Sequence, residues 1–158
     1  MPIQNYNLYT DNAYRGQLAY ASEPRTIVSG SLENATAEFG VALKMGAADG
    51  DVALGHDGGN VFGIALREAN HEAAFRPSDG TTFYKKTETV SVLRQGTVNV
   101  LLSGAGASAK GSVLNVDDVT GEFTADPVAA GITASYNVIA LETATAGSII
   151  KARIDIVA

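Results

Sequence analysis

The feature of this sequence that most constrains its fold is the stretch TETVSVLRQGTVNVLL at residues 87–102. Apolar residues of one parity alternate there with polar residues of the other, which is the two-residue period of a strand with one buried face. Thr97 belongs to the polar set and is predicted to face solvent. Gln95-Gly96 preserves the parity, so we expect one long strand, or two nearly collinear strands, bent at the glycine. The predicted core set is Val90, Val92, Val98, Val100 and Leu102.

The composition favours a mainly β fold. The chain has 17 glycines, many Ala, Val, Thr and Ser residues and few long charged helix formers, which suits short strands joined by tight turns. At 158 residues it is long enough for one domain that buries about 70% of its unfolded surface. Because strand-like segments do not alternate with helical ones, we expect a single-domain small β-barrel or sandwich, jelly-roll or β-tulip-like, rather than an α/β fold.

Several other segments also have strand character. Residues 60–66, with the sequence NVFGIAL, form a strong apolar strand in which Gly63 allows a backbone or a ring to approach closely. Residues 112–116 and 121–124 are predicted to pair as a hairpin. Residues 67–84 have the most helix-like composition, and we expect an excursion between strands there, with at most one or two helical turns. The remaining strands are expected within 36–45, 52–54, 136–141 and 150–156.

The first thirty residues differ from the rest of the chain. They hold four of the six tyrosines, without a steady period of 2 or 3.6: Tyr6, Tyr9, Tyr14 and Tyr20. A tyrosine ring offers a large apolar area with a polar tip, which suits a segment that lies on a surface. We therefore interpret residues 1–30 as an extended N-terminal arm and residues 31–158 as one barrel or sandwich. The alternative is that these rings close one end of the barrel of their own subunit.

Composition also excludes several classes of function. The absence of cysteine rules out a disulfide framework, a thiolate zinc site and a cysteine nucleophile. A formal charge of −6, a pI near 4.8 and 11 scattered basic residues argue against a nucleic-acid partner. The first residues lack the apolar core of a signal peptide, and no run approaches the ~18 apolar residues of a membrane span. We expect a soluble protein that is made in the cytoplasm and has no membrane partner.

No pattern of catalytic or metal-binding residues emerges. The densest polar cluster, Asp49, Asp51, His56 and Asp57, does not match a calcium-binding loop, because apolar residues stand where oxygen ligands are needed. His56 and His71 are interpreted as surface histidines, since neither belongs to a recognisable catalytic arrangement. The glycine-rich segments GHDGG and SGAGASAKG do not match a phosphate-binding loop. We therefore predict no enzyme activity and no catalytic, cofactor-binding or metal-binding residues.

The order of several motifs resembles the structural cement proteins of tailed-bacteriophage capsids. The resemblance covers nearly the whole chain, and its most specific part combines YxGQLA with FGxA, GIA and VSVLRxGxVxV. In this sequence the segments read AYRGQLAYASEP, AEFGVALKMG, VFGIALRE, VSVLRQGTVNVLL, GSVLNVDDVTGEFT and ALETATAGSIIKARIDI.

The resemblance implies a capsid decoration protein, found on the outer surface of the virion, that holds neighbouring major capsid subunits together at two-fold or three-fold positions. The expected partners are the major capsid protein and the protein itself, as a homotrimer or, alternatively, a dimer. The competing hypothesis is a small β-barrel carbohydrate-binding, spike or tail module, although the chain lacks the Trp residues usual in sugar sites. We expect the capsid or subunit interface at Tyr6, Tyr9, Tyr14, Arg15, Gln17 and Leu18. If the arm does not bind, the expected alternative surface lies along Lys151, Arg153 and Asp155.

Overall fold

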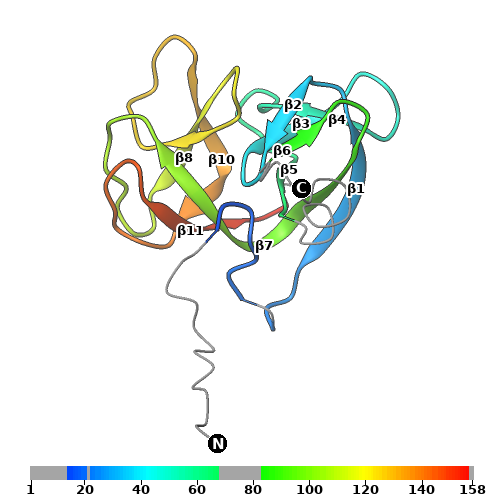
Figure 1. Cartoon of the computed structure of the whole chain (residues 1–158). Coiled ribbons are helices and arrows are strands. Elements are labelled where there is room, and N and C mark those ends of the chain that lie inside the picture. The colour runs from blue at the N-terminus through cyan, green and yellow to red at the C-terminus, as the bar shows by residue number, and fades with distance from the viewer. Residues whose placement is uncertain (1–13, 21, 68–82, 157–158) are drawn as a thin grey trace, which may run out of the picture.

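The computed structural model describes residues 14–20, 22–67 and 83–156, and its longest element is strand β7, Thr89–Ser103 (Figure 1). β7 is continuous and bends at Gly96, which has a φ of 136° that a residue with a side chain rarely adopts. The five apolar residues predicted for the core are all fully buried. The prediction of one long strand, bent at the glycine, is therefore confirmed.

The other strands are short and β7 links them into one sheet. A separate two-stranded ribbon pairs β2 with β6. Among the described residues there is no helix with the length and apolar character of a membrane span. The strand bounds are β1 (Thr26–Leu32), β2 (Thr36–Glu38), β3 (Ala42–Met45), β4 (Asp51–Leu54), β5 (Gly63–Ala65), β6 (Phe83–Lys85), β8 (Val113–Asp117), β9 (Phe123–Thr124), β10 (Ile132–Ala140) and β11 (Ile149–Ile154).

The sheet closes into two rings of strands that share β7. The first ring runs β1-β4-β3-β5-β7 and returns to β1, and the second runs β7-β11-β10-β8-β9 and returns to β7. Each antiparallel pairing reverses the strand direction, so a ring of five strands needs an odd number of parallel pairings to close. The pairs β1–β4 and β7–β9 supply one each. The expected barrel is thus present as two small lobes on either side of the bend (Figure 1).

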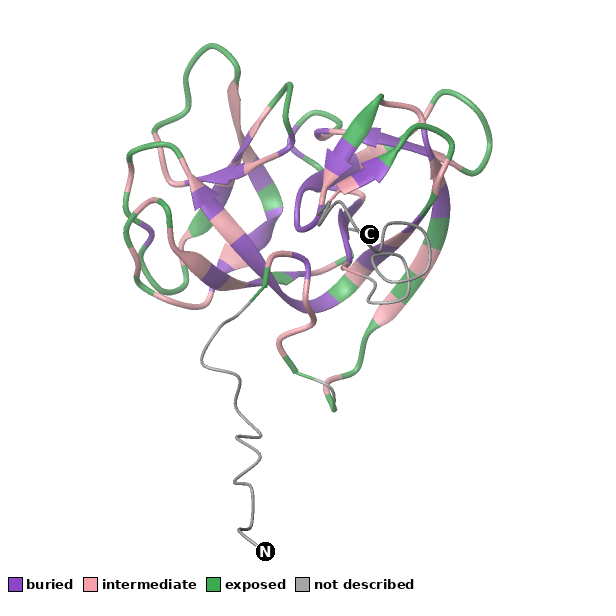
Figure 2. Ribbon diagram, in the orientation of Figure 1, coloured by how far each residue is buried: buried purple, intermediate pink, exposed green. Residues whose placement is uncertain are grey.

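The buried side chains form two clusters, and β7 contributes to both. One cluster lies in the first lobe, and the second fills the second lobe and extends to Ala42 and Ile64 of the first. Figure 2 shows buried positions along β7 on both sides of the bend. Val90 and Val92 pack in the first lobe with Phe39 and Tyr84, whose rings meet edge to face at 5.2 Å. The residues of β7 after the bend fill the second lobe. Leu93 has the parity of the predicted solvent face, yet it is fully buried in the second cluster. The reason is that β7 is covered on both faces where the lobes meet.

Polar side chains fasten the two lobes together. The buried Asn137 on β10 binds Val61 through two hydrogen bonds, accepting from its N–H (3.1 Å) and donating to its carbonyl (2.8 Å). His56 accepts a hydrogen bond at Nδ1 from Gly59 N–H, so Nε2 carries the proton and donates to Asp118 at 2.7 Å. The interpretation of His56 as a surface histidine is wrong, because only 11% of its side chain is exposed. His71 lies outside the described residues.

Other predictions are confirmed with small changes of boundary. β8 and β9 form the expected hairpin, and Asp117 accepts hydrogen bonds from the N–H groups of Val119 and Thr120 in its turn. A Cβ on Gly63 would lie 2.2 Å from Val92 Cγ1, so β5 does approach its neighbour closely. Most of the expected excursion, residues 68–82, lies outside the described residues. The prediction for Thr97 is wrong, because Thr97 and Asn99 are both buried.

The core role of β7 can be tested by truncating its side chains. Val92→Ala and Val100→Ala should each lower the free energy of unfolding by about 1–3 kcal/mol, from lost burial and a residual cavity. Thr89→Ala, at an exposed position of the same strand, should change it by less than about 0.5 kcal/mol. Urea denaturation measures all three, and equal losses at Val92 and Thr89 would contradict the assigned faces.

Candidate functional site

Residues 14–20 lie against β7 and are followed by β1, so this part of the predicted arm packs on the sheet. Gly16 N–H donates to Asn99 carbonyl oxygen (2.7 Å), Asn99 N–H to Gln17 (2.9 Å), and Ala19 N–H to Thr97 (3.0 Å). Thr26 then pairs with Gln95 as β1 begins. Residues 16–19 and β1 thus both run antiparallel to β7, after and before the bend respectively, and the sheet starts at Thr26 rather than after residue 30.

At Gly16 this segment passes directly over the backbone of the first lobe, next to Phe39 and Arg67. Gly16 accepts a hydrogen bond at its carbonyl from Arg67 N–H at 2.8 Å, and its φ is +73°. A Cβ here would lie 2.9 Å from both Arg67 N and Phe39 Cβ. A Cβ on Gly40 would in turn lie 2.9 Å from Gly16 N. The backbones approach so closely that a side chain does not fit at either position.

The side chains of Tyr14 and Arg15 also make contacts within the subunit. Arg67 stacks its guanidinium over the Tyr14 ring at 4.0 Å, while Tyr14 remains 49% exposed. Arg15 contacts Glu122 at 3.3 Å and Glu38 at 3.9 Å, which joins the segment to both lobes. Arg67 and Glu122 were not predicted from sequence, because they lie far along the chain and no periodicity relates them to Arg15.

Gln17 and Leu18 border a hollow of about 520 Å³ that is also lined by Tyr14, Leu66 and Arg67. Leu18 forms an isolated bridge with Val98 and packs against the second core cluster. Its role in the subunit is therefore structural at least in part. Tyr6 and Tyr9, the other two predicted anchors, lie outside the described residues.

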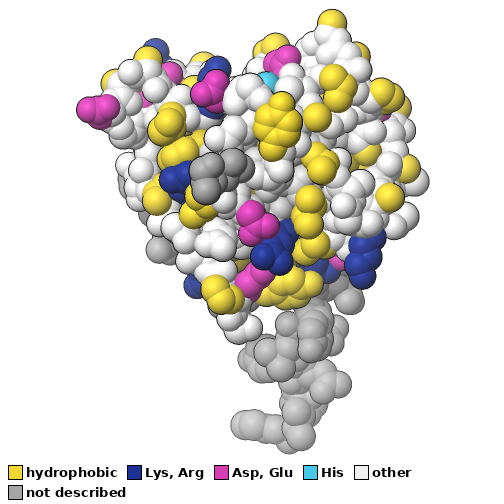
Figure 3. Space-filling model, turned by 180° about the vertical axis from the view of Figure 1, so that it is seen from behind, with side chains coloured by type: hydrophobic (Ala, Val, Ile, Leu, Met, Phe, Trp, Pro, Cys, Tyr) yellow, Lys and Arg dark blue, Asp and Glu magenta, His cyan; other side chains and the backbone are white. Residues whose placement is uncertain are grey.

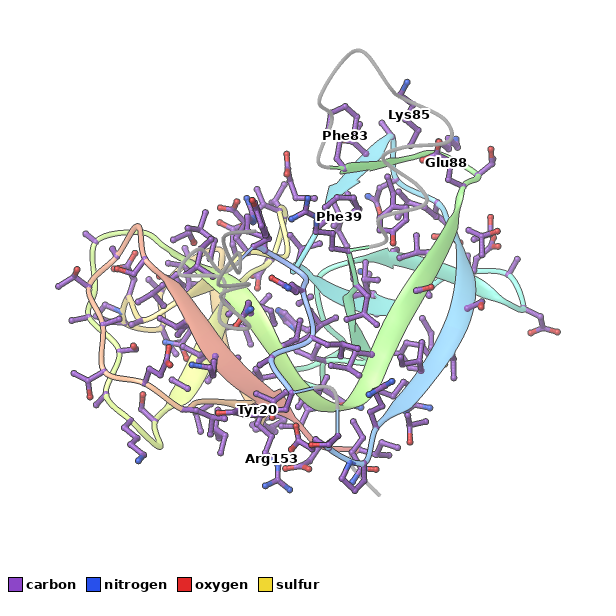
Figure 4. All side chains as sticks on the ribbon, turned by 60° about the horizontal axis from the view of Figure 1, so that its bottom comes forward. Tyr20, Phe39, Phe83, Lys85, Glu88 and Arg153 are labelled. Carbon is purple, nitrogen blue, oxygen red and sulfur yellow. The ribbon has the colours of Figure 1, made fainter. Side chains whose placement is uncertain are left out.

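The charged face of β11, named above as an alternative surface, holds its ions in local pairs. Lys151 Nζ donates to Glu142 Oε1 at 2.6 Å, and Arg153 contacts Asp155 at 3.3 Å. Figure 4 shows Arg153 and Tyr20 at the same end of the molecule, and Figure 3 shows charged side chains of both signs gathered near the lower end of the rear face. Positive and negative side chains are therefore mixed on the surface around β11.

The described residues give no sign of a catalytic or metal centre. Within these parts of the chain, no group of three or more His, Cys, Asp or Glu side chains comes together in a way that could hold a metal ion. Among the same residues a close histidine–carboxylate pair, His56 with Asp118, joins two loops, and its hydrogen bond lowers the pKa of Asp118. The features that could serve a function in these residues are therefore the exposed aromatic side chains, such as Tyr14, Tyr20 and Tyr136.

Comparison with known proteins identifies the family. The family model described as "Structural cement protein (E217 gp24/Pam3 gp6)" matches residues 2–155. The chain belongs to the phage structural cement proteins. The resemblance seen in the sequence motifs is therefore confirmed over nearly the whole chain, and the family is a structural one.

A solved structure supports the fold of this cement protein. A chain described as "The capsid of Myoviridae Phage XM1" superimposes with a TM-score of 0.72 at 17% sequence identity, and 98% of each chain is covered. At this identity the likeness concerns the fold, and it confirms the mainly β barrel expected from the sequence. A search of curated proteins gave no match.

The crossing at Gly16 predicts a specific sensitivity to added side chains. Gly111 is the matched control, because its φ of +84° is similar but an added Cβ would meet nothing within 4 Å. Gly111→Ala should lower the free energy of unfolding by about 1–2 kcal/mol from the backbone conformation alone. Gly16→Ala should cost more in urea denaturation, because it adds a clash with backbone and Phe39. We call the backbone hydrogen bonds that hold residues 16–19 to β7 and Arg67 the clamp. Equal costs for the two substitutions would show that the clamp does not hold this segment tightly.

The pair Glu142–Lys151 predicts a dependence of this cement protein's stability on pH. The hydrogen bond from Lys151 is the main reason that the pKa of Glu142 lies below its usual value of 4.5. The stability that this carboxylate contributes is therefore present above the usual pKa and is lost as the pH falls through the lowered one. Glu142→Gln should reduce the free energy of unfolding at neutral pH by less than about 1 kcal/mol, because both side chains are more than a third exposed. Urea denaturation over a series of acidic pH values should show this difference vanish, and a constant difference would contradict it.

Proposed function

We propose that this protein attaches to the outer surface of an assembled phage head and holds neighbouring major capsid subunits together. Membership of the structural cement family and the likeness of its fold to a phage capsid chain support this role. The protein is expected to be made in the host cytoplasm and to reside on the virion. On this proposal the binding partner is the major capsid protein, and no chemical reaction is required.

The observation that carries the proposal is the clamped base of the N-terminal segment. Three backbone hydrogen bonds to β7 and one from Arg67 hold residues 16–19, so the chain before Tyr14 starts from a fixed place. Tyr14 is half exposed beside the 520 Å³ hollow, at the border between the clamped and the preceding residues. A rigid base with aromatic residues ahead of it suits an attachment arm, because less of the arm must be ordered on binding.

We further propose that the protein works as a homo-oligomer, with a trimer favoured and a dimer as the alternative. A cement must contact more than one capsid subunit, and closed symmetry matches the axes of a lattice. Many identical sites then multiply weak contacts through effective concentration. Averaged density of decorated shells would show the copy number at each axis, and a lone monomer away from any axis would contradict this.

The attachment role can be tested by removing the arm ahead of the clamp. A variant lacking residues 2–12 should remain folded but decorate undecorated heads poorly, and Tyr14→Ala should weaken decoration about thirtyfold if this ring supplies about 2 kcal/mol. The measurement is the occupancy of purified heads after incubation with variant and intact protein in competition.

Tyr136→Ala is the matched control, because Tyr136 is 70% exposed but lies on β10, away from β7 in the strand order. It should decorate as well as the intact protein. Full occupancy by the truncated variant under competition would show that the contact surface lies elsewhere, with Lys151, Arg153 and Asp155 as the next candidates.

A further inference from the structure

Among the described residues of the first lobe, part of one edge of β1 forms no hydrogen bonds with a neighbouring strand of the ring. Backbone groups point alternately to the two sides of β1: Leu32 N–H donates to Glu88 on the β7 side, whereas Ser31 N–H donates to Gly50 on the β4 side. By the same alternation, Ile27 and Ser29 present their N–H and C=O groups toward the β4 side. However, β4 pairs only with Ser31 and Leu32. Within the described residues the edge of β1 from Thr26 to Gly30 is therefore unpaired on that side.

This open edge borders a hollow of mixed character. The hollow, of about 290 Å³, is lined by Ser29 of β1, by Met45, Val52 and Phe62, and by the turn 46–51, which includes Asp49 and Asp51. Two apolar side chains near this edge are well exposed, Met45 at 67% and Ile27 at 43%. Figures 1 and 4 both show β1 along the outer margin of the first lobe. Unpaired backbone groups next to exposed apolar side chains are the features that bind an added strand.

We propose that this edge binds the N-terminal segment of a second copy of the chain, which adds a strand beside β1. The sequence Asn5-Tyr6-Asn7-Leu8 alternates polar and apolar residues, so Tyr6 and Leu8 would share one face of an added strand. The five residues Thr26–Gly30 span about 17 Å, and residues 5–9 match that length. The thirteen residues ahead of Tyr14 reach about 40 Å when extended, which is enough to cross to a neighbour.

The base of the arm lies beside the other lobe from the open edge. Gly16 bonds with Asn99 after the bend of β7, whereas Ser29 of the open edge lies opposite Ser91 before the bend, eight residues along the same strand. A turn closed by Gln17 N–H and the Tyr14 carbonyl oxygen directly precedes this base. We assign the segment to a second copy because its exchange between neighbouring subunits would join them, as the proposed cement role requires. This inference rests on the proposed attachment role and names the partner of the arm.

The absence of cysteine makes disulfide trapping a direct test. Ser29→Cys supplies the acceptor edge in one population of full-length protein, and Asn5→Cys, Tyr6→Cys or Asn7→Cys supplies the arm in another. The two populations are mixed on heads and in solution, oxidised, and run on a non-reducing gel. We expect a covalent dimer as the main product with Asn5→Cys and Asn7→Cys, and much less with Tyr6→Cys, because Ser29 lies on the exposed face of β1, where the polar residues of an added strand would also lie, while Tyr6 and Leu8 would face the side of Val28 and the core. Thr145→Cys, in the exposed turn before β11, is the matched control acceptor and should give little dimer.

The outcomes separate this inference from the attachment role. If cross-links to Ser29→Cys do not exceed those to Thr145→Cys, or form within a chain carrying both cysteines in place of between chains, the second-copy assignment is overturned. In that case poor decoration by the variant lacking residues 2–12 still supports attachment, with the capsid as the arm's partner. Conversely, strong and alternating cross-links together with full decoration by the truncated variant would support strand exchange and overturn attachment through the arm.

Discussion

The two hydrogen-bonding edges of β7 are the constraint on which the rest of the structure depends. A strand has two edges, and buried N–H and C=O groups on each of them must find partners. Before the bend those partners are β1 and β5, and after it they are β11, residues 16–19 and, at the end of the strand, β9. Gly96 lets the strand turn between the two sets, because its backbone conformation carries no steric penalty. One glycine therefore allows one strand to serve two rings.

Closing two five-stranded rings has a geometric consequence for stability. Each ring needs a parallel pair, and the two parallel contacts, β1–β4 and β7–β9, join only two residue pairs each. These closures lie within the rings, so the position of one lobe relative to the other depends on β7 and on further contacts between the lobes. Asn137 provides one, since its side-chain amide bonds with both the N–H and the C=O of Val61, as a neighbouring strand would. The hydrogen bond between His56 and Asp118 provides another. Because buried polar groups are costly when unpaired, these side chains also favour one relative position of the lobes.

Local patterns in the sequence predicted the elements well and their partners poorly. Alternation located β7, β11 and the hairpin of β8 and β9, because each has one dominant buried face or a turn with its own hydrogen bonds. The same reasoning failed at Leu93 and Thr97, since it assumed that one face of β7 is exposed along its whole length, whereas both faces are buried at these positions. It also treated residues 14–20 as part of a loose arm. Nothing local indicates that Gly16 bonds with Asn99 or that Arg15 meets Glu122, a residue 107 positions away.

The clamp changes what the tyrosine-rich beginning of the chain can do. The motif YRGQLA, at residues 14–19, includes the close backbone crossing at Gly16 and the packed side chain of Leu18, so its residue types follow from the requirements of the subunit itself. A particle presents the same site many times, and weak contacts made from a fixed base then combine through effective concentration. Within the described residues both rings close on themselves, and the proposed strand addition uses one short open edge of β1, from Thr26 to Gly30. An edge of limited length favours one defined mode of association over indiscriminate pairing.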